Sequence, residues 1–585
     1  MPHSLVRAIL LGVLSVTVAL ALAACGSSDG GGGNAATVDS GSDGRRGGTL
    51  TLLTSQDVAN LDPGITYSSL DLNLLSATQR PLYRYAPDNP TDIEPDLAAA
   101  QPEVSSDGRT LTVRIRRGVR FGPPVNREVT SRDVRYAIER GFNPNVANPY
   151  APQYYGQIVG ADRADGGPIE GITTPDDQTI VFRLTRPTAS LMAESMVLPL
   201  SAPVAQEYAR PFDARSPSDY GNHVVSTGPY MLSADSDGRV LGTGYVPGRS
   251  LRLERNPNWS GATDDRPAYL DAIEWRIGGR PTVSGRQVLE GRGMILGDSP
   301  PPALVKRAYQ DARDQIFFSP GAGNRYVTLN TAIPPFDDEN VRKAVAAALD
   351  REQMRRVRGG EVVGDVANHF LYPGVLGFEE AGGQEGTGVD FLAETQGDPD
   401  LAAEYMRRAG FADGRYDGDE TIQVVGLAGA PDDADAQIVD QTLQELGFRT
   451  NLRIVDASVY YSRFCALPRA RVHVCPNVGW VRDFADPQTV LNLPFNGAYI
   501  FPENNPNISQ LDDPAINRAM ARGELTVGTQ ERADAWGEID RMVTATAAAV
   551  PWLWDKQPNL FAEDVRCVPQ LWNLGRCDFS YTSIE

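Results

Sequence analysis

The sequence predicts an α/β protein with at least two lobes, and three observations lead to this fold class. First, about 540 residues follow the N-terminal leader and tether, which is more than a single hydrophobic core accommodates. Second, several short segments alternate apolar and polar residues with the period of a half-buried strand. Third, an amphipathic helical pattern ends on a glycine and is followed directly by a strand-like segment, which is half of an α/β unit.

The N-terminus has the parts of an export signal. A short segment with one positive charge (MPHSLVR) precedes an apolar run (AILLGVLSVTVALALA), and the run stops at Cys25. We therefore expect residues 1–24 to be a signal peptide. The stretch LAAC resembles a bacterial lipobox, and this resemblance implies cleavage before Cys25 and acylation of its sulfur. The alternative is an uncleaved transmembrane anchor, because the run approaches the length that spans a bilayer.

Residues 25–46 predict a flexible tether. They are rich in glycine and serine and have no apolar period, so they cannot offset the entropy cost of ordering. Such a chain has a root-mean-square reach of about 25 Å. A lipid-modified protein would then be held at the outer face of a cell membrane while remaining free to tilt.

The overall charge excludes some classes of partner. The formal charge is −21, with 54 basic and 75 acidic residues, and it becomes −22 once Arg7 leaves with the signal (53 basic against 75 acidic). Such a chain is not expected to bind nucleic acid or an anionic surface. With 41% hydrophobic residues the composition is that of an ordinary globular protein, and no second apolar run is long enough to cross a membrane.

Strands are expected first along the chain. In three segments, 110–119, 178–184 and 272–277, apolar side chains recur at every second position, so they lie on one face of a strand. The expected inward residues are Leu111, Val113 and Ile115; Ile180, Phe182 and Leu184; and Ile273, Trp275 and Ile277.

Helices follow in the second half. Residues 337–354 begin with aspartates and place apolar residues on one helical face, and residues 398–410 begin on acidic caps and stop at Gly410. Residues 436–455 predict a helix that ends at Gly447, followed by a strand with Leu452 and Ile454 pointing inward.

The cysteines agree with export. Four follow the leader, Cys465, Cys475, Cys567 and Cys577, and four cysteines permit three pairings. Pairing within CALPRARVHVC and within CVPQLWNLGRC would close two short loops at modest entropic cost, and we favour this arrangement over crossed pairs. The spacing does not suit a metal site, because neither a CxxC motif nor a histidine cluster is present.

Enzymatic chemistry has little support. Ser299 in MILGDSPPP superficially resembles the nucleophile of one esterase family, but the Asp-x-x-His that this family keeps near its end is missing here. The isolated histidines give no reason to expect a metal, and no phosphate-binding loop is present. We therefore predict that the protein is not an enzyme and uses no cofactor.

Many short motifs, taken in order, resemble one family. They are GGTLTL…NLDPG, PLYRY, EPDLAAAQPEVSSDGRTLTVRIRRGVRF, VTSRDVRYAIER, STGPYML, LRLERNPNW, YVTLNTAIPPFDDENVRKAVAAALDREQM, AAEYMRRAGF and GWVRDFADP. The chain resembles the extracytoplasmic solute-binding proteins of ABC importers, specifically bacterial solute-binding protein family 5, which contains the oligopeptide and dipeptide receptors. The matches occur in family order from about residue 47 almost to the C-terminus.

This resemblance implies the architecture. The family has the two-lobed periplasmic-binding-protein fold of the class II, cluster C type, with an extra subdomain inserted in lobe I. Lobe I would then comprise residues 47–84, 187–297 and 548–585, the inserted subdomain residues 85–186, and lobe II residues 298–547.

The resemblance also places a ligand site in the segment VCPNVGWVRDFADPQT. Its mixture of an aromatic and several charged side chains is costly to bury without partners. In peptide-binding members a Trp-x-x-Asp stretch faces the cleft and its aspartate pairs with the ligand's α-ammonium group, and Trp480 and Asp483 match that pattern. The backbone of Asn477, Val478 and Gly479 would pair with an extended peptide. Tyr67 would line the opposite wall, by its place in the family order.

Arg482 departs from the family pattern and leaves an alternative open. It could form an internal ion pair with Asp483 or Asp486, and the site would then prefer a ligand without a free amine. The leading hypothesis is a monomeric transport receptor that hands a peptide or related solute to a membrane permease driven by a separate ATPase. A sensory receptor with the same cleft, or a member that binds a non-peptide solute, remains the alternative.

Overall fold

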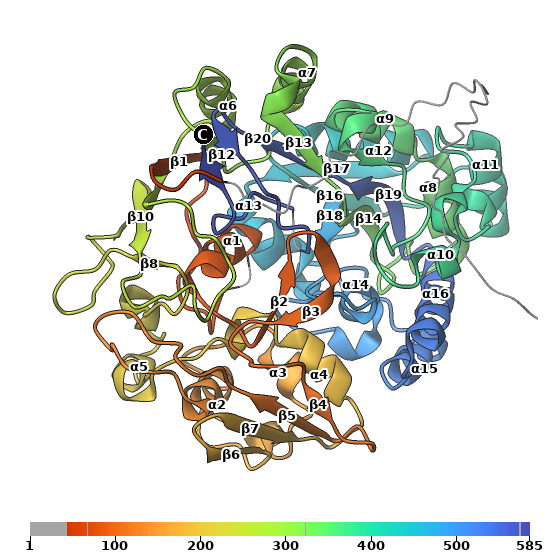
Figure 1. Cartoon of the computed structure of the whole chain (residues 1–585). Helices are drawn as coiled ribbons and strands as arrows, with labels where there is room; N and C mark the ends of the chain where they lie inside the picture. The colour runs from red at the N-terminus through yellow and green to blue at the C-terminus, as the bar shows by residue number, and fades with distance from the viewer. Residues whose placement is uncertain (1–43, 67, 322, 573–574) are drawn as a thin grey trace, which may run out of the picture. The chain divides into compact units, whose positions relative to one another are not determined.

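The computed structural model describes residues 44–66, 68–321, 323–572 and 575–585 (Figure 1). Within these residues the strands form two six-stranded sheets, one four-stranded sheet and three two-stranded pairs. The α-helices are α1 (Ser69–Thr78), α2 (Ser131–Arg140), α3 (Ala151–Tyr155), α4 (Ala189–Ser195), α5 (Gln206–Asp213), α6 (Pro281–Leu289), α7 (Pro302–Asp311), α8 (Glu339–Ala348), α9 (Arg351–Arg358), α10 (Phe378–Ala381), α11 (Pro399–Arg408), α12 (Asp432–Glu445), α13 (Ala457–Val459), α14 (Gln488–Phe495), α15 (Pro514–Gly523) and α16 (Thr529–Ala545).

The first lobe is built on a mixed sheet. Its strand order is β12 (Ile295–Leu296), β1 (Thr49–Thr54), β11 (Ala272–Ile277), β10 (Ser250–Arg255) and β8 (Tyr230–Leu232), with β9 (Tyr245–Val246) paired to β10. β1 runs parallel to both β11 and β12, whereas β10 is antiparallel to β11. Ile273 and Trp275 are fully buried, as the alternating pattern of β11 predicts.

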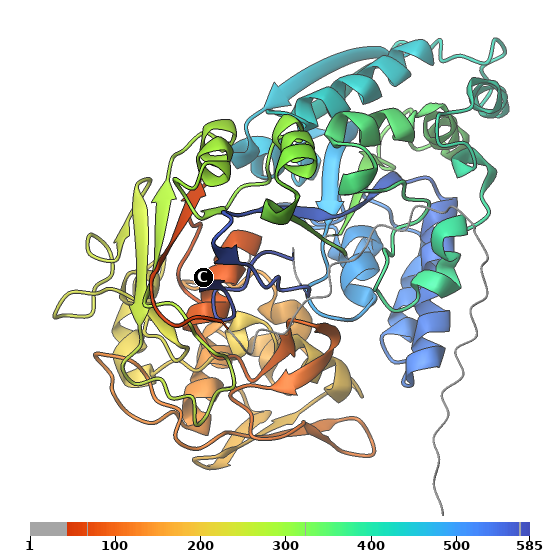
Figure 2. The same ribbon diagram turned by 45° about the horizontal axis from the view of Figure 1, so that its top comes forward.

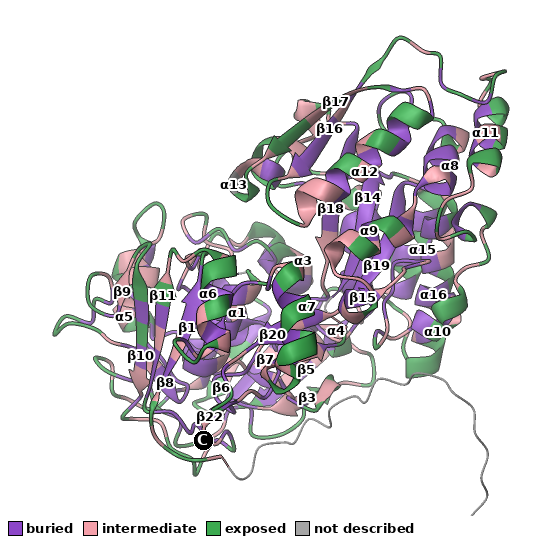
Figure 3. Cartoon of the chain, turned by 90° about the horizontal axis from the view of Figure 1, so that it is seen from above, coloured by how far each residue is buried: buried purple, intermediate pink, exposed green. Residues whose placement is uncertain are grey.

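The second lobe contains the other six-stranded sheet. Its order is β15 (Gly364–Asp365), β19 (Ala549–Asp555), β14 (Asn324–Leu329), β18 (Val474–Trp480), β16 (Thr421–Leu427) and β17 (Arg449–Val455). Figure 3 shows β14, β18 and β19 in the colour of buried residues, while α9 and α12 present exposed faces to solvent. The sheet therefore supplies the core of this lobe, and the helices cover it.

The inserted subdomain has its own antiparallel sheet. The strand order is β4 (Glu103–Val104), β5 (Thr110–Arg114), β7 (Thr179–Arg183) and β6 (Ile172–Asp176), and a hairpin of β2 (Tyr83–Ala86) and β3 (Asn89–Pro95) lies beside it in Figure 1. The expected inward residues of β5 and β7 are buried in one hydrophobic cluster. Two α/β lobes and an inserted subdomain confirm the predicted fold class.

Two details of the second lobe differ from the sequence prediction. The helix expected over residues 337–354 is two helices, because the chain leaves the helical conformation at Leu349 and Asp350 then caps α9 by accepting from Gln353 N at 2.7 Å. Ile454 of β17 was expected to point inward but is 38% exposed. The reason is that β17 is an edge strand that pairs only with β16 among the described strands.

From the sequence, we expect the chain to return to the first lobe at residue 548. In the structure this return comes later along the chain. β19 still belongs to the sheet of the second lobe, where it pairs with β14. The next strand, β20 (Gln557–Leu560), pairs with β13 (Ile316–Ser319), and β21 (Val565–Arg566) pairs with β22 (Ser583–Ile584). In Figure 2 the C-terminal segment, in dark blue, runs beside α1 of the first lobe.

The two predicted disulfides are confirmed. Cys465 is bonded to Cys475 and Cys567 to Cys577, each over a separation of 10 residues. Loops of this size stabilise the folded state by about 2 to 3 kcal/mol in the chain-entropy model. The second disulfide closes a C-terminal loop that reaches the contact between the lobes.

The leader, Cys25 and the tether up to residue 43 lie outside the described residues. In the part that is described, no helix combines the length and the apolar character that a membrane span requires.

Candidate functional site

The predicted site segment begins as a central strand. β18 pairs along one edge with β14, from Val474 opposite Leu329 to Trp480 opposite Asn324. Along its other edge it pairs with β16 only at Val474, because the two strands diverge beyond that residue. The second half of β18 therefore has one edge outside the sheet ladder.

A tyrosine hydroxyl bonds to this free edge. Asn477 N donates to the hydroxyl of Tyr460 at 3.2 Å. Val478, the next residue, is buried. The edge predicted to pair with an extended ligand is thus present, but a ligand that uses the Asn477 N–H would have to displace the Tyr460 hydroxyl.

Trp480 does not lie free in a cleft. Its indole Nε1 donates to Thr489 O at 2.6 Å in α14, and the ring packs on the core of the second lobe. This contact ties the end of β18 to the start of α14 and so fixes the loop between them, residues 481–487. We call these residues the acidic loop, because they contain Asp483 and Asp486.

Asp483 lies where the acidic loop meets the inserted subdomain. Its side chain is 8% exposed, and it accepts a hydrogen bond from the hydroxyl of Tyr154 in α3. The next residue, Phe484, is fully buried within the hydrophobic cluster of the inserted subdomain, with its ring edge-on to Tyr154 at 5.0 Å between centroids. Ala485 N donates to the hydroxyl of Tyr85 at 2.8 Å.

Arg482 spans three segments of the chain. Its Nη2 donates to Pro90 O at 2.9 Å, its Nη1 to Gly374 O at 3.1 Å and its Nε to Trp572 O at 3.3 Å. Pro90 lies at the start of β3, Gly374 in the second lobe, and Trp572 in the C-terminal loop. All three acceptors are neutral carbonyl oxygens. The buried guanidinium of Arg482 therefore links the three segments through hydrogen bonds and not through an ion pair.

The alternative ion pair of Arg482 is not found. Asp486 instead pairs with Arg532 of α16 through two contacts of 2.6 and 2.7 Å, and among the described residues no carboxylate oxygen lies within 4 Å of the Arg482 guanidinium. Nearby, burial and then the Asp486 carboxylate raise the pKa of Glu194 in α4 to about 7.

A polar cavity of about 80 Å³ adjoins the site. It is lined by Tyr154, the partner of Asp483, and by residues of the inserted subdomain and of α14. Across it Arg186 pairs with Glu524 at 3.1 Å, and Asn492 donates to the same carboxylate at 2.8 Å. The cavity thus lies where the second lobe faces the inserted subdomain.

Sequence reasoning missed most of the partners of the acidic loop. Tyr85, Tyr154 and Trp572 are remote from it along the chain. Tyr85 lies in the family motif PLYRY, but nothing in that motif indicates a contact with the acidic loop. Tyr67, predicted for the opposite wall, lies outside the described residues.

The residues of the rejected hydrolase hypothesis are dispersed. The Asp298 carboxylate accepts from Ser55 N and Oγ at 2.7 Å, whereas His369 is buried in the second lobe against Asp540 at 2.8 Å. His473 accepts from Gln423 N in the same lobe. These contacts give each group a structural role.

Two α/β lobes that meet at a buried acidic loop define a solute-binding protein. The chain belongs to the bacterial extracellular solute-binding proteins, family 5, whose model matches residues 92–501.

Individual relatives agree in length and fold. The chain is 25% identical to the oligopeptide-binding protein OppA of Bacillus subtilis, over 94% of this chain and 95% of the relative. It is also 25% identical to di/tripeptide-binding protein 2 of Pseudomonas aeruginosa, over 88% and 90%. The solved structure of clavulanic acid biosynthesis oligopeptide binding protein 2 is 30% identical and superposes with a TM-score of 0.79, covering 92% of this chain and 96% of that one.

Proposed function

We propose that the protein captures a short peptide or related amine-bearing solute outside the cell and delivers it to the permease of an ABC importer. The observation that carries the proposal is Asp483, a nearly buried carboxylate at the contact between the second lobe and the inserted subdomain. A carboxylate shielded from water attracts a cation more strongly than one on an open surface. The names of the relatives, which are oligopeptide- and dipeptide-binding proteins, support a peptide as the ligand.

Ligand binding would replace one hydrogen-bond donor at Asp483 by another. An entering α-ammonium group would compete with the Tyr154 hydroxyl for the carboxylate and would add a positive charge that the hydroxyl lacks. The free edge of β18 would accept the peptide backbone as an added strand. Such backbone pairing tolerates many side chains, so we expect a ligand class and not a single sequence.

Native purification should reveal the ligand. We expect protein isolated without denaturation to carry peptides or other amines, identified by mass spectrometry after acid release. A parallel sample of the Asp483→Ala variant should carry much less of the same solute. Recovery of a solute without any amine, at equal levels from both proteins, would contradict the proposed ligand class.

We also propose that the mature protein is a monomer anchored to the membrane by lipid on Cys25. The expected result is an N-terminal fragment that begins at an acylated Cys25, since the preceding residues resemble a lipobox. Two or three acyl chains would hold the protein firmly, whereas a single chain gives marginal binding. The masses of N-terminal fragments from membrane fractions test this, and an intact Met1 or an unmodified Cys25 would refute it.

A further inference from the structure

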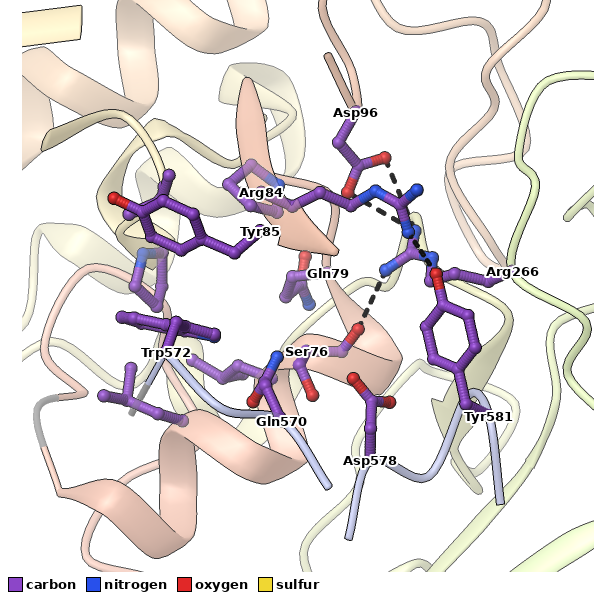
Figure 4. A pocket seen from close by; sticks show the side chains of 15 residues that line it. Ser76, Gln79, Arg84, Tyr85, Asp96, Arg266, Gln570, Trp572, Asp578 and Tyr581 are labelled. Atoms are coloured by element: carbon purple, nitrogen blue, oxygen red, sulfur yellow. Dashed lines mark hydrogen bonds and ion pairs between the residues drawn. The ribbon is translucent and has the colours of Figure 1, made fainter. Parts of the chain in front are cut away.

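A second cavity lies where the first lobe meets the inserted subdomain, and Asp483 is not among the residues that line it. Its volume is about 50 Å³, and its walls come from α1, from the segment around β2 and from the C-terminal loop closed by the Cys567–Cys577 disulfide (Figure 4). A single water occupies about 10–15 Å³ on this measure, so the cavity has room for roughly three to five atoms of that size.

The charged side chains that line this cavity are Arg84, Arg266, Asp96 and Asp578. Three of them have a direct ion pair: Asp96 with Arg80, Arg84 with Asp265, and Arg266 with Asp264, each at 2.6 Å. Asp578 is 5% exposed, and no described cation lies within 4 Å of its oxygens. Asp578 is therefore the charged group of the lining without a direct ion pair among the described residues.

Two acceptors line the cavity, and one of them lacks a donor. Asp578 Oδ1 accepts from Ser580 N at 2.8 Å. Gln79 of α1 is 1% exposed; its Nε2 donates to Val225 O at 3.3 Å, but its Oε1 is buried without a partner. Figure 4 shows Gln79 near the centre of the cavity and the Asp578 carboxylate directed into it. The Asp578 carboxylate and Gln79 Oε1 can therefore accept hydrogen bonds from a bound molecule.

The remaining wall is apolar and aromatic. Leu72 and Leu75 of α1 line the cavity together with Tyr85 and Trp572, whose ring centroids are 5.7 Å apart. Aromatic faces attract cations, and leucine side chains suit a short aliphatic chain. Burial raises the pKa of the Asp578 carboxyl even though Arg266 and Arg84 lie nearby, as expected for a carboxylate whose desolvation has not been offset.

We propose that this cavity is a second binding site, specific for a primary ammonium group on a short aliphatic chain. The ammonium would pair with Asp578 and donate to Gln79 Oε1, and its chain would lie between the leucines and the aromatic rings. Two sources can supply this chemistry, a free alkylamine or the lysine side chain of a bound peptide. The second is compatible with the fold because Tyr85 and Trp572 also contact the acidic loop.

Calorimetric titration of the mature protein with propylammonium tests the proposal. The titration is made in an Asp483→Asn background, so that the site proposed for peptides does not contribute. We expect saturable binding of one propylammonium per chain, and none of propionate or 1-propanol, at fixed pH and ionic strength. Asp578→Asn should weaken binding at least about tenfold, because it removes the charge that the ammonium pairs with. Asp237→Asn removes an equal charge from an exposed loop and should leave binding unchanged.

Further measurements guard against misfolding and distinguish the source. Gln79→Leu removes the unpaired acceptor, together with the amide group that donates to Val225 O, and should also weaken propylammonium binding. It replaces Asp578→Asn if that variant does not fold. To identify the source, the affinities of two peptides that differ only in lysine or norleucine are compared in protein with Asp483 intact. Tighter binding of the lysine peptide that is lost in Asp578→Asn indicates a peptide side chain. Equal affinities of the two peptides indicate a free amine. Absence of saturable propylammonium binding, or equal binding by Asp578→Asn and Gln79→Leu, would overturn the proposal whether or not peptides bind at Asp483.

Discussion

Replacing Asp483 by alanine is expected to weaken peptide binding by roughly 2 to 5 kcal/mol, the usual result of removing one partner of a buried charged pair. The carboxylate is 8% exposed and lies at the contact with the inserted subdomain, so a bound α-ammonium group would lose most of its water. Without Asp483 that charge would be buried beside an uncharged hydroxyl. Calorimetry with the peptide recovered from the native protein gives the affinity directly.

Two further variants sharpen the Asp483 experiment. Asp483→Asn retains the shape of the side chain and removes its charge, so it should reproduce most of the loss. Tyr154→Phe removes the hydroxyl that now donates to Asp483, and it should affect the affinity far less, because the hydroxyl and the ligand compete for the same carboxylate. Undiminished binding by Asp483→Asn would assign the amine to another group.

The second large effect is expected for Arg482→Met. Methionine fills part of the same space but donates no hydrogen bonds, so the carbonyl groups of Pro90, Gly374 and Trp572 would lose their donor. Each carbonyl that remains buried costs about 1 to 3 kcal/mol. We expect a lower melting temperature, weaker peptide binding and a larger radius of gyration in X-ray scattering, since Arg482 links the second lobe to the first.

The direction of the change in affinity separates this role from charge compensation. If Arg482 neutralised Asp483, its removal would strengthen the binding of amines. If it links the lobes, removal weakens binding, because a smaller fraction of the protein has the binding-competent arrangement. Arg469→Met serves as the control, because Arg469 is exposed and pairs with Glu503 on the surface. An Arg482→Met protein with unchanged melting temperature and affinity would refute the linking role.

Local patterns in the sequence identified much of the fold. The alternation in β5, β7 and β11 placed the correct residues inward, and the glycine at 447 ended α12 before β17 began. Such signals depend on neighbours within a few residues, so they can be read from the chain directly. They failed at Ile454 and at Leu349, where the position of a strand in the sheet and the meeting of two helices decided the outcome.

For the candidate site, too, some residues could be recognised from the sequence and others could not. The motif that contains Trp480 and Asp483 could be recognised along the chain, and so could the two disulfides, because each of these features is local. The partners of the motif could not be recognised, because Tyr154 and Trp572 reach it only after the lobes have assembled.

The sequence by itself determined the family and the α/β class; it favoured the local pairing of the cysteines, and the family resemblance pointed to Asp483 as the acidic residue proposed to bind the ligand. Only the tertiary structure decided that Arg482 bonds to three carbonyl groups and not to a carboxylate, that the Tyr460 hydroxyl bonds to the edge of β18, and that Asp578 has no cation within pairing distance among the described residues. The physical reason is that charge pairing and desolvation depend on distances of a few ångströms between side chains. For residues hundreds of positions apart, those distances are set by the packing of whole lobes.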